Sequence, residues 1–164
     1  MMILPDNFDP AERGARARDY FLAGYNCCQA VLLAFSDVLE ANKLATAQSL
    51  SVIGSGFGGG YARMRHVCGS FTACTMLAGF ISPADSTDLQ VRTANYSLVQ
   101  EMAMDFRAVN GSIVCSEMLE QKERQAEGPE PSARTQEYYA KRPCPEIVRN
   151  AAVIAAKKMK EAAR

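Results

Sequence analysis

Residues 26–38 read NCCQAVLLAFSDV, and their apolar side chains recur with the period of an α-helix. The residues that share one face of that helix are Cys27, Val31, Ala34, Phe35 and Val38. Asn26 is a favourable N-cap, so we expect Cys27 in the first turn and on the buried face. This stretch therefore predicts a helical protein with a cysteine at a helix start.

The rest of the chain continues the helical pattern. Further helices are expected over about residues 10–24, 46–53, 66–80, 88–110, 115–119 and 145–163. Asp9 should cap the helix over 10–24, and Ser86 or Thr87 the one over 88–110. Leu50 and Ile53 should point inward, and an apolar stripe on the helix over 88–110 consists of Leu89, Tyr96, Val99, Ala103 and Phe106. No segment alternates as a strand does. The sequence thus predicts an all-α, single-domain bundle of about six to seven helices over residues 1–164.

One long segment departs from this pattern. Residues 121–142 are polar and contain Pro129 and Pro131, so we expect an exposed connection with one helical turn around Tyr138. Pro143 and Pro145 flank Cys144 beyond it, and proline suits a first helical position. The connection therefore ends where the last helix begins.

Charge and hydropathy exclude several classes of function. The 164 residues carry 18 basic and 18 acidic side chains, which gives no broad attraction to nucleic acid or anionic membranes. No apolar run approaches the ~18 residues of a membrane span, so membrane insertion is not expected. The first ten residues lack the pattern of a secretory signal, which favours a cytoplasmic location.

The six cysteines are the unusual feature of the composition. A domain of this size does not need disulfides, so such a set more often indicates metal or redox chemistry. Four of them fall at or beside predicted helix starts: Cys27, Cys68, Cys115 and Cys144. Unpaired N–H groups and the helix dipole stabilise a thiolate at such positions. Cys28 and Cys74 are expected to be small apolar fillers.

A glycine-rich run, GSGFGGG, occupies residues 54–60. It lacks the Gly-Lys-Ser/Thr ending of a phosphate loop and follows no strand, so a nucleotide site is not expected. Instead Gly58, Gly59 and Gly60 would let the backbone approach the Cys68 helix and offer N–H donors to cysteine sulfurs, a supporting role at a redox or cofactor site.

Four blocks of sequence carry a resemblance to a known family. They are GYNCCQAVLLAF (24–35), GFGGGYARMRHVCGSFTACTMLAGF (56–80), VNGSIVCSEML (109–119) and RPCPEIVRNAAVIAA (142–156). These blocks resemble the C_GCAxxG_C_C family, small helical proteins described as redox-active. The resemblance implies that the shared cysteines are Cys27, Cys68, Cys115 and Cys144, and that the glycines at 58–60 belong to the pattern.

This chain departs from the family pattern at two positions. Ser70 stands where alanine is usual, and Ala73 stands where the last glycine of the central stretch would be. The family is also similar to the split-Soret cytochromes, but the chain has no C-x-x-C-H, so a c-type haem is not expected.

Three functions are consistent with these features. The first is thiol–disulfide or electron-transfer chemistry by a thiol-dependent oxidoreductase; Cys68 would attack, given its nearby arginines and glycines, and Cys27 or Cys144 would resolve. The second is an iron–sulfur cluster or zinc held by the four cysteines. The third is a non-catalytic helical accessory protein; the resemblance suggests association with a transporter. An unknown redox partner and a homo-oligomer both stay open.

Overall fold

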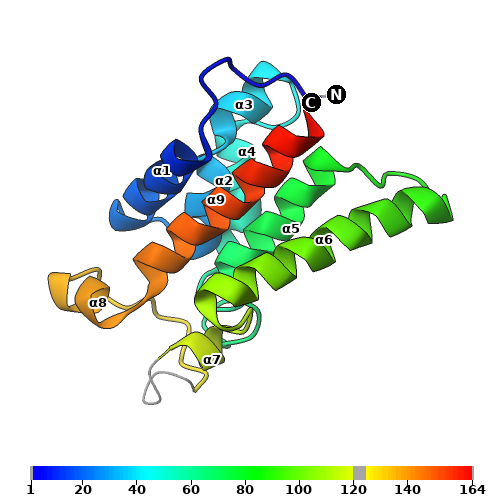
Figure 1. Ribbon diagram of the computed structural model, residues 1–164. Coiled ribbons are helices and arrows are strands. Elements are labelled where there is room, and N and C mark those ends of the chain that lie inside the picture. The colour runs from blue at the N-terminus through cyan, green and yellow to red at the C-terminus, as the bar shows by residue number, and fades with distance from the viewer. Residues whose placement is uncertain (1, 120–124, 164) are drawn as a thin grey trace.

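Nine α-helices and a single 3-10 turn form the regular structure of residues 2–119 and 125–163, the part of the chain that the computed structural model describes (Figure 1). In chain order they are α1 (Pro10–Leu22), α2 (Cys27–Leu33), α3 (Ser36–Ala41), α4 (Ala47–Gly54), η1 (Ser55–Phe57), α5 (Gly69–Ile81), α6 (Leu89–Asn110), α7 (Cys115–Met118), α8 (Gln136–Lys141) and α9 (Cys144–Ala162). The all-α prediction is confirmed.

Helix α9 is the centre of the bundle. Figure 1 shows it running between α1 on one side and α5 and α6 on the other, and it also contacts α2. Its buried face includes four alanines, Ala151, Ala152, Ala155 and Ala156. Helix α1 approaches it closely at Gly14, where an added Cβ would lie 2.7 Å from Val153 Cγ2. The largest side chains buried around it include Phe21, Phe35, Leu77, Met102, Phe106 and Met159.

The helix ends match the local signals in the sequence. The Asp9 carboxylate accepts hydrogen bonds from two backbone N–H groups of the first turn of α1. Asn26 and Gln29 form a reciprocal capping box at the start of α2. Gly111 closes α6 in the left-handed conformation, with φ of 91°.

The helix predicted over residues 26–38 is two helices. Its hydrogen bonding is interrupted because Arg13 of α1, buried in the core, donates from Nη1 to the Ala34 carbonyl at 2.8 Å. The Ser36 hydroxyl donates to the Leu33 carbonyl at 3.0 Å, and α3 begins at that serine. This break, together with the separate helix α8, raises the helix number above the six to seven expected.

Two apolar residues expected to be buried on α4 and α6 are exposed. Ile53 is 58% exposed and Leu89 is 77% exposed. Helix α6 packs chiefly on α5 and α9, and its first half projects from the bundle (Figure 1). Its N-cap is Asp88, whose carboxylate accepts from two backbone N–H groups, rather than Ser86 or Thr87.

The two chain ends lie at one end of the bundle, and α7 and α8 lie at the other (Figure 1). Residues 121–124 of the expected connection are outside the described part of the chain. Among the described residues, no helix combines the length and apolar character needed to span a bilayer.

Candidate functional site

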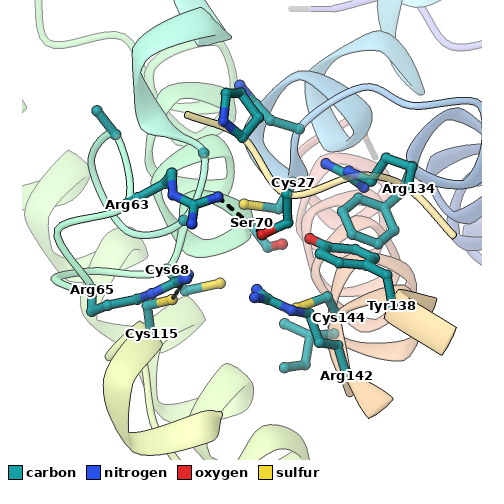
Figure 2. A pocket seen from close by; sticks show the side chains of 18 of the residues that line it. Cys27, Arg63, Arg65, Cys68, Ser70, Cys115, Arg134, Tyr138, Arg142 and Cys144 are labelled. Carbon is teal, nitrogen blue, oxygen red and sulfur yellow. Dashed lines mark hydrogen bonds between the residues drawn. The ribbon is translucent and has the colours of Figure 1, made fainter. Parts of the chain in front are cut away.

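Four cysteines meet at the end of the bundle where α7 and α8 lie. Cys27, Cys115 and Cys144 are the first residues of α2, α7 and α9, and Cys68 is the N-cap of α5. All four line one cavity of about 250 Å³, and Figure 2 shows their side chains around its interior. The structure therefore brings together four residues that are far apart in sequence.

A short backbone pairing holds two of these cysteines side by side. An isolated antiparallel bridge joins Val67, just before Cys68, to Val114, just before Cys115. The pairing continues where the Cys115 N–H donates to the His66 carbonyl at 2.7 Å. Successive residues of extended chain point to opposite faces. Because each cysteine is next to a bridge residue, both sulfurs point to the same face and into the cavity.

The glycine run approaches the cysteines closely. Gly58 and Gly59 line the cavity, and the Gly59 N–H hydrogen-bonds to the Cys27 sulfur. Gly60 does not line the cavity but packs behind it, where an added Cβ would lie 2.7 Å from the Cβ of Cys115. These three glycines thus form backbone walls around two of the sulfurs.

The backbone stays left-handed beyond the glycines. After Gly59 and Gly60, the next three residues also have positive φ: Tyr61 at 62°, Ala62 at 49° and Arg63 at 68°. This conformation costs a non-glycine residue about 1–2 kcal/mol. Backbone strain of this kind clusters at functional sites. Here it turns the chain so that Arg63 lines the cavity.

Cys27 and Cys68 influence each other's acidity in opposite directions. The Cys68 thiol is the largest cause of the lowered pKa of Cys27, and the N–H groups of Gly59, Cys28 and Gly69 lower it further. Burial opposes these effects. The resulting pKa is about 6, compared with the ordinary 9.0. The neighbouring Cys27, and burial, raise the pKa of Cys68 well above 9.0. The arrangement favours a Cys27 thiolate beside a Cys68 thiol.

The other two cavity cysteines remain protonated thiols. Burial raises the pKa of Cys144 to about 12, and negative charge on Cys27 adds to this. Burial likewise raises the pKa of Cys115, although Arg65 partly offsets it through a contact from Nη1 to the sulfur at 3.8 Å. Only one of the four sulfurs is therefore set up as a thiolate near neutral pH.

Cys28 and Cys74 lie away from the cavity. Both are fully buried in the core, and burial raises the pKa of each thiol, to about 12 for Cys74. The Cys74 sulfur contacts the Ala151 carbonyl at 3.4 Å. Their surroundings are those of small apolar fillers.

Four arginines also line the cavity, and two of them come from the connection before α9. Arg63 and Arg65 both pair with Glu127, at 2.5 Å for Arg65 Nη2. Arg134 and Arg142 line the opposite wall together with Tyr138, as Figure 2 shows. Sequence reasoning missed these three. Their spacing of four residues, typical of one helix face, is the signal that could have found them.

A match to a known family covers most of the chain. The family model described as "Putative redox-active protein (C_GCAxxG_C_C)" matches residues 25–158. The chain belongs to this family. No curated protein and no solved structure matches it.

In this C_GCAxxG_C_C protein, the geometry changes the expected role of Cys68. The sequence favoured Cys68 as the attacking residue because arginines and glycines precede it. The structure instead directs three backbone N–H groups at Cys27 and one, from Ser70, at Cys68. The better-solvated sulfur anion is therefore that of Cys27.

The four cavity cysteines are also the residues expected to serve as ligands if the protein holds a metal. One ion held by cysteines needs three or four sulfurs converging on a single point. In the described part of the chain, no group of three or more His, Cys, Asp or Glu side chains is placed to hold a metal ion.

Proposed function

We propose that this protein is a thiol–disulfide oxidoreductase in which Cys27 attacks and Cys68 resolves. The observation that carries the proposal is the placement of Cys27 and Cys68 in one cavity, with the Cys27 sulfur against Gly69, the residue after Cys68. There the pKa of Cys27 is lowered to about 6 and that of Cys68 is raised, so Cys68 stays protonated. A nucleophilic thiolate with a second thiol in contact is the minimum a dithiol redox site needs. The family's description as redox-active is consistent with this role.

The lowered pKa has its largest effect below neutral pH. At pH 7 a thiol of pKa 6 is about nine-tenths thiolate, whereas one of pKa 9 is about 1% thiolate. Intrinsic nucleophilicity falls with pKa, with a Brønsted slope of about 0.4–0.5, so the net advantage at pH 7 is only about three- to six-fold. At pH 6 the same arithmetic gives about fifteen- to thirty-fold.

The reaction balances as two exchanges. The Cys27 thiolate attacks a disulfide R–S–S–R′, forming Cys27–S–S–R and releasing R′S⁻. The Cys68 thiol then loses its proton to the released thiolate and attacks the Cys27 sulfur, which releases RS⁻ and leaves a Cys27–Cys68 disulfide. The protein is oxidised by two electrons and the substrate is reduced by two. An external dithiol would return the protein to its reduced form.

Cys115 and Cys144 have no step in this scheme. Both are protonated, and both lie in the cavity wall within electrostatic range of Cys27. We assign them to the wall of the cavity that receives the substrate. In a four-thiolate metal centre, by contrast, all four cysteines would be equally necessary.

Trapping of a mixed disulfide tests the proposal. Cys68→Ser exposed to hydroxyethyl disulfide, a small neutral reagent, should accumulate one adduct at Cys27, identified by mass spectrometry of the intact protein and its peptides. The wild type should pass on to the internal disulfide, and Cys27→Ser should do neither. Cys74→Ser is the matched control and should behave as the wild type. An adduct that forms on Cys68 in Cys27→Ser, and none on Cys27 in Cys68→Ser, would reverse the assignment.

A further inference from the structure

We propose that the cavity selects a small anionic disulfide, one whose carboxylate or sulfonate group binds Arg134 and Ser70 while its S–S bond faces Cys27. This inference deepens the proposed function, on which it rests. It comes from the walls of the cavity rather than from the cysteines.

The charge of the walls is strongly one-sided. Four arginines line the cavity, and none of the described lining residues carries a carboxylate. Glu127, just outside, pairs with Arg63 and Arg65, and the Cys27 thiolate supplies one further negative charge. Basic side chains are thus gathered among the described lining residues, although the whole chain has a net charge of zero. An anion is therefore the ligand that this concave surface attracts.

Arg134 is held in place while part of its guanidinium has no protein partner. It stacks at 4.5 Å from the Phe21 ring and 4.9 Å from the Tyr138 ring, and its Nη2 donates to the Tyr25 carbonyl at 3.4 Å. Its Nη1 is buried and has no hydrogen-bond partner among the described residues. A guanidinium that is held by stacking and has one unpaired N–H donor group is suited to hydrogen-bond an oxyanion.

Ser70 is a second unpartnered group at the same cavity. Its side chain is fully buried, and its hydroxyl has no hydrogen-bond partner in the described part of the chain. Buried hydroxyl groups are normally paired, so an unpaired one in a cavity wall points to a ligand. Its backbone N–H meanwhile hydrogen-bonds to the Cys68 sulfur. The orphaned hydroxyl therefore lies next to the reacting pair.

The size of the cavity limits the substrate to a small molecule. The volume of about 250 Å³ equals roughly eight water molecules at ~30 Å³ each. A short dicarboxylate disulfide such as dithiodipropionate is in this size range. Tyr138 and Ile147 supply the apolar contacts for the carbon chain.

The balanced steps for such a substrate are those given above. The Cys27 thiolate attacks one sulfur of the substrate disulfide, and the other half of the substrate leaves as a thiol after taking the proton of Cys68. Cys68 then attacks the Cys27 sulfur, which releases the second half of the substrate as a thiolate. Electrostatic attraction that holds the substrate anion raises the rate of the first exchange. Its role ends there, because neither Arg134 nor Ser70 exchanges a proton in the scheme.

Three disulfides of similar size and different charge provide the test. Dithiodipropionate is anionic, hydroxyethyl disulfide is neutral and cystamine is cationic. The second-order rate constant of each disulfide with the reduced protein is divided by its rate constant with dithiothreitol. This ratio removes differences in the intrinsic reactivity of the three disulfides. We expect the anionic disulfide to lead the neutral one by about tenfold, the equivalent of one charge-assisted contact. Arg134→Gln should remove that lead, Ser70→Ala should reduce it, and Arg92→Gln, an exposed arginine of α6, should leave it unchanged.

A pair of alkylating reagents separates anion binding from thiol acidity. Iodoacetate and iodoacetamide modify Cys27 by the same reaction, but only iodoacetate is charged. Arg134→Gln should lower the iodoacetate rate by about tenfold and change the iodoacetamide rate much less, since Arg134 is not among the largest causes of the low pKa of Cys27. An equal fall with both reagents would mean that Arg134 only supports the fold, which overturns the inference.

The two proposals can fail separately. Equal normalised rates for the three disulfides, or an anion preference that survives Arg134→Gln, would overturn the anion site and leave the Cys27–Cys68 exchange standing. The opposite case, an anion site without disulfide exchange, is tested with suberate, the all-carbon counterpart of dithiodipropionate. If suberate binds the wild type by calorimetry and not Arg134→Gln, while no disulfide reacts with Cys27, the anion site stands and the oxidoreductase proposal fails.

Discussion

The Cys27 sulfur lies against the start of α5 at Gly69, the residue that follows Cys68, where an added Cβ would be 2.5 Å away, and Cys68 is the largest cause of the low pKa of Cys27. Two identical side chains thereby take opposite protonation states, because the backbone N–H groups around them are unevenly shared. The following predictions depend on that asymmetry and on the backbone that creates it.

The first prediction concerns the pH dependence of Cys27 alkylation. The rate with iodoacetamide should follow a single titration with its midpoint near pH 6, the pKa of Cys27. Cys68→Ala should move the midpoint upward, because Cys68 is the largest cause of the low value. The measurement is peptide-resolved alkylation from pH 4.5 to 9. A midpoint that stays at the same pH in Cys68→Ala would show that Cys68 does not set the acidity of Cys27.

The second prediction is the stability of the reduced protein as a function of pH. The pKa of Cys27 in the folded state is lowered to about 6 from 9.0. Its contribution to the free energy of unfolding is therefore complete above pH 9 and is lost as the pH falls through 6. The thiols of Cys74 and Cys144 have raised pKa values in the folded state. Their contribution to the free energy of unfolding is therefore present below pH 9 and is lost as the pH rises above it.

Unfolding free energy should therefore rise from pH 6 to about 9 and fall beyond, as measured by denaturant titration under a phosphine reductant. Cys27→Ser should remove the rise and keep the fall. A rise of the same size in Cys27→Ser would mean that another group causes it.

The third prediction compares two glycines of α5. A Cβ at Gly69 would lie 2.5 Å from the Cys27 sulfur and 2.6 Å from the Phe57 carbonyl oxygen, whereas nothing lies within 4 Å of one at Gly79. Gly69→Ala should cost about 1–3 kcal/mol and slow Cys27 alkylation. Gly79→Ala should stabilise by about 0.5–1 kcal/mol through helix propensity and leave the alkylation rate unchanged. Equal effects of the two on stability would contradict the close packing of α5 against Cys27.

The fourth prediction tests the left-handed backbone after Gly60. Ala62 has φ of 49° and is exposed. Ala62→Gly should relieve backbone strain, and glycine should also add entropy to the unfolded chain, which opposes this gain. The net effect should be a folded state more stable by about 0.5–1 kcal/mol. The control is Ala108→Gly, at an exposed position inside α6, which should destabilise by about 1 kcal/mol. Thermal denaturation separates the two. Destabilisation by Ala62→Gly would mean that the turn is not left-handed there.

The cysteine positions could be predicted because helix starts are local features. Asn26 with Gln29 three residues later, and Pro145 after Cys144, fix where two helices begin without reference to the rest of the fold. The cysteines of the site follow from such signals. The glycines at 58–60 were predicted near them for the same reason, since only a backbone without Cβ approaches so closely.

The choice between Cys27 and Cys68 could not be predicted in this way. It depends on N–H groups of Gly59 and Gly69, which reach Cys27 only after the loop and α5 have packed against α2. The left-handed run through Arg63 was also beyond the sequence, because non-glycine residues avoid that conformation unless tertiary contacts impose it. The arginines of the connection were overlooked because a polar, proline-containing segment is usually solvated.

The apolar faces of α4 and α6 were predicted to be more buried than they are. Periodicity identifies one face of a helix, but it does not show whether a neighbour covers that face along its full length. Ile53 and Leu89 are exposed, whereas Phe106, at the other end of α6, is fully buried.

Peptide mapping after limited oxidation tests the central claim most directly. Anaerobically purified, reduced protein is treated with one equivalent of hydroxyethyl disulfide, its metal content is measured, and its cysteines are assigned by mass spectrometry. The account predicts a Cys27–Cys68 disulfide in metal-free protein, with Cys115 and Cys144 as free thiols, and the same disulfide in Cys115→Ser and Cys144→Ser. Stoichiometric metal that is lost in any of the four single cysteine variants, or a disulfide between another pair, would contradict it.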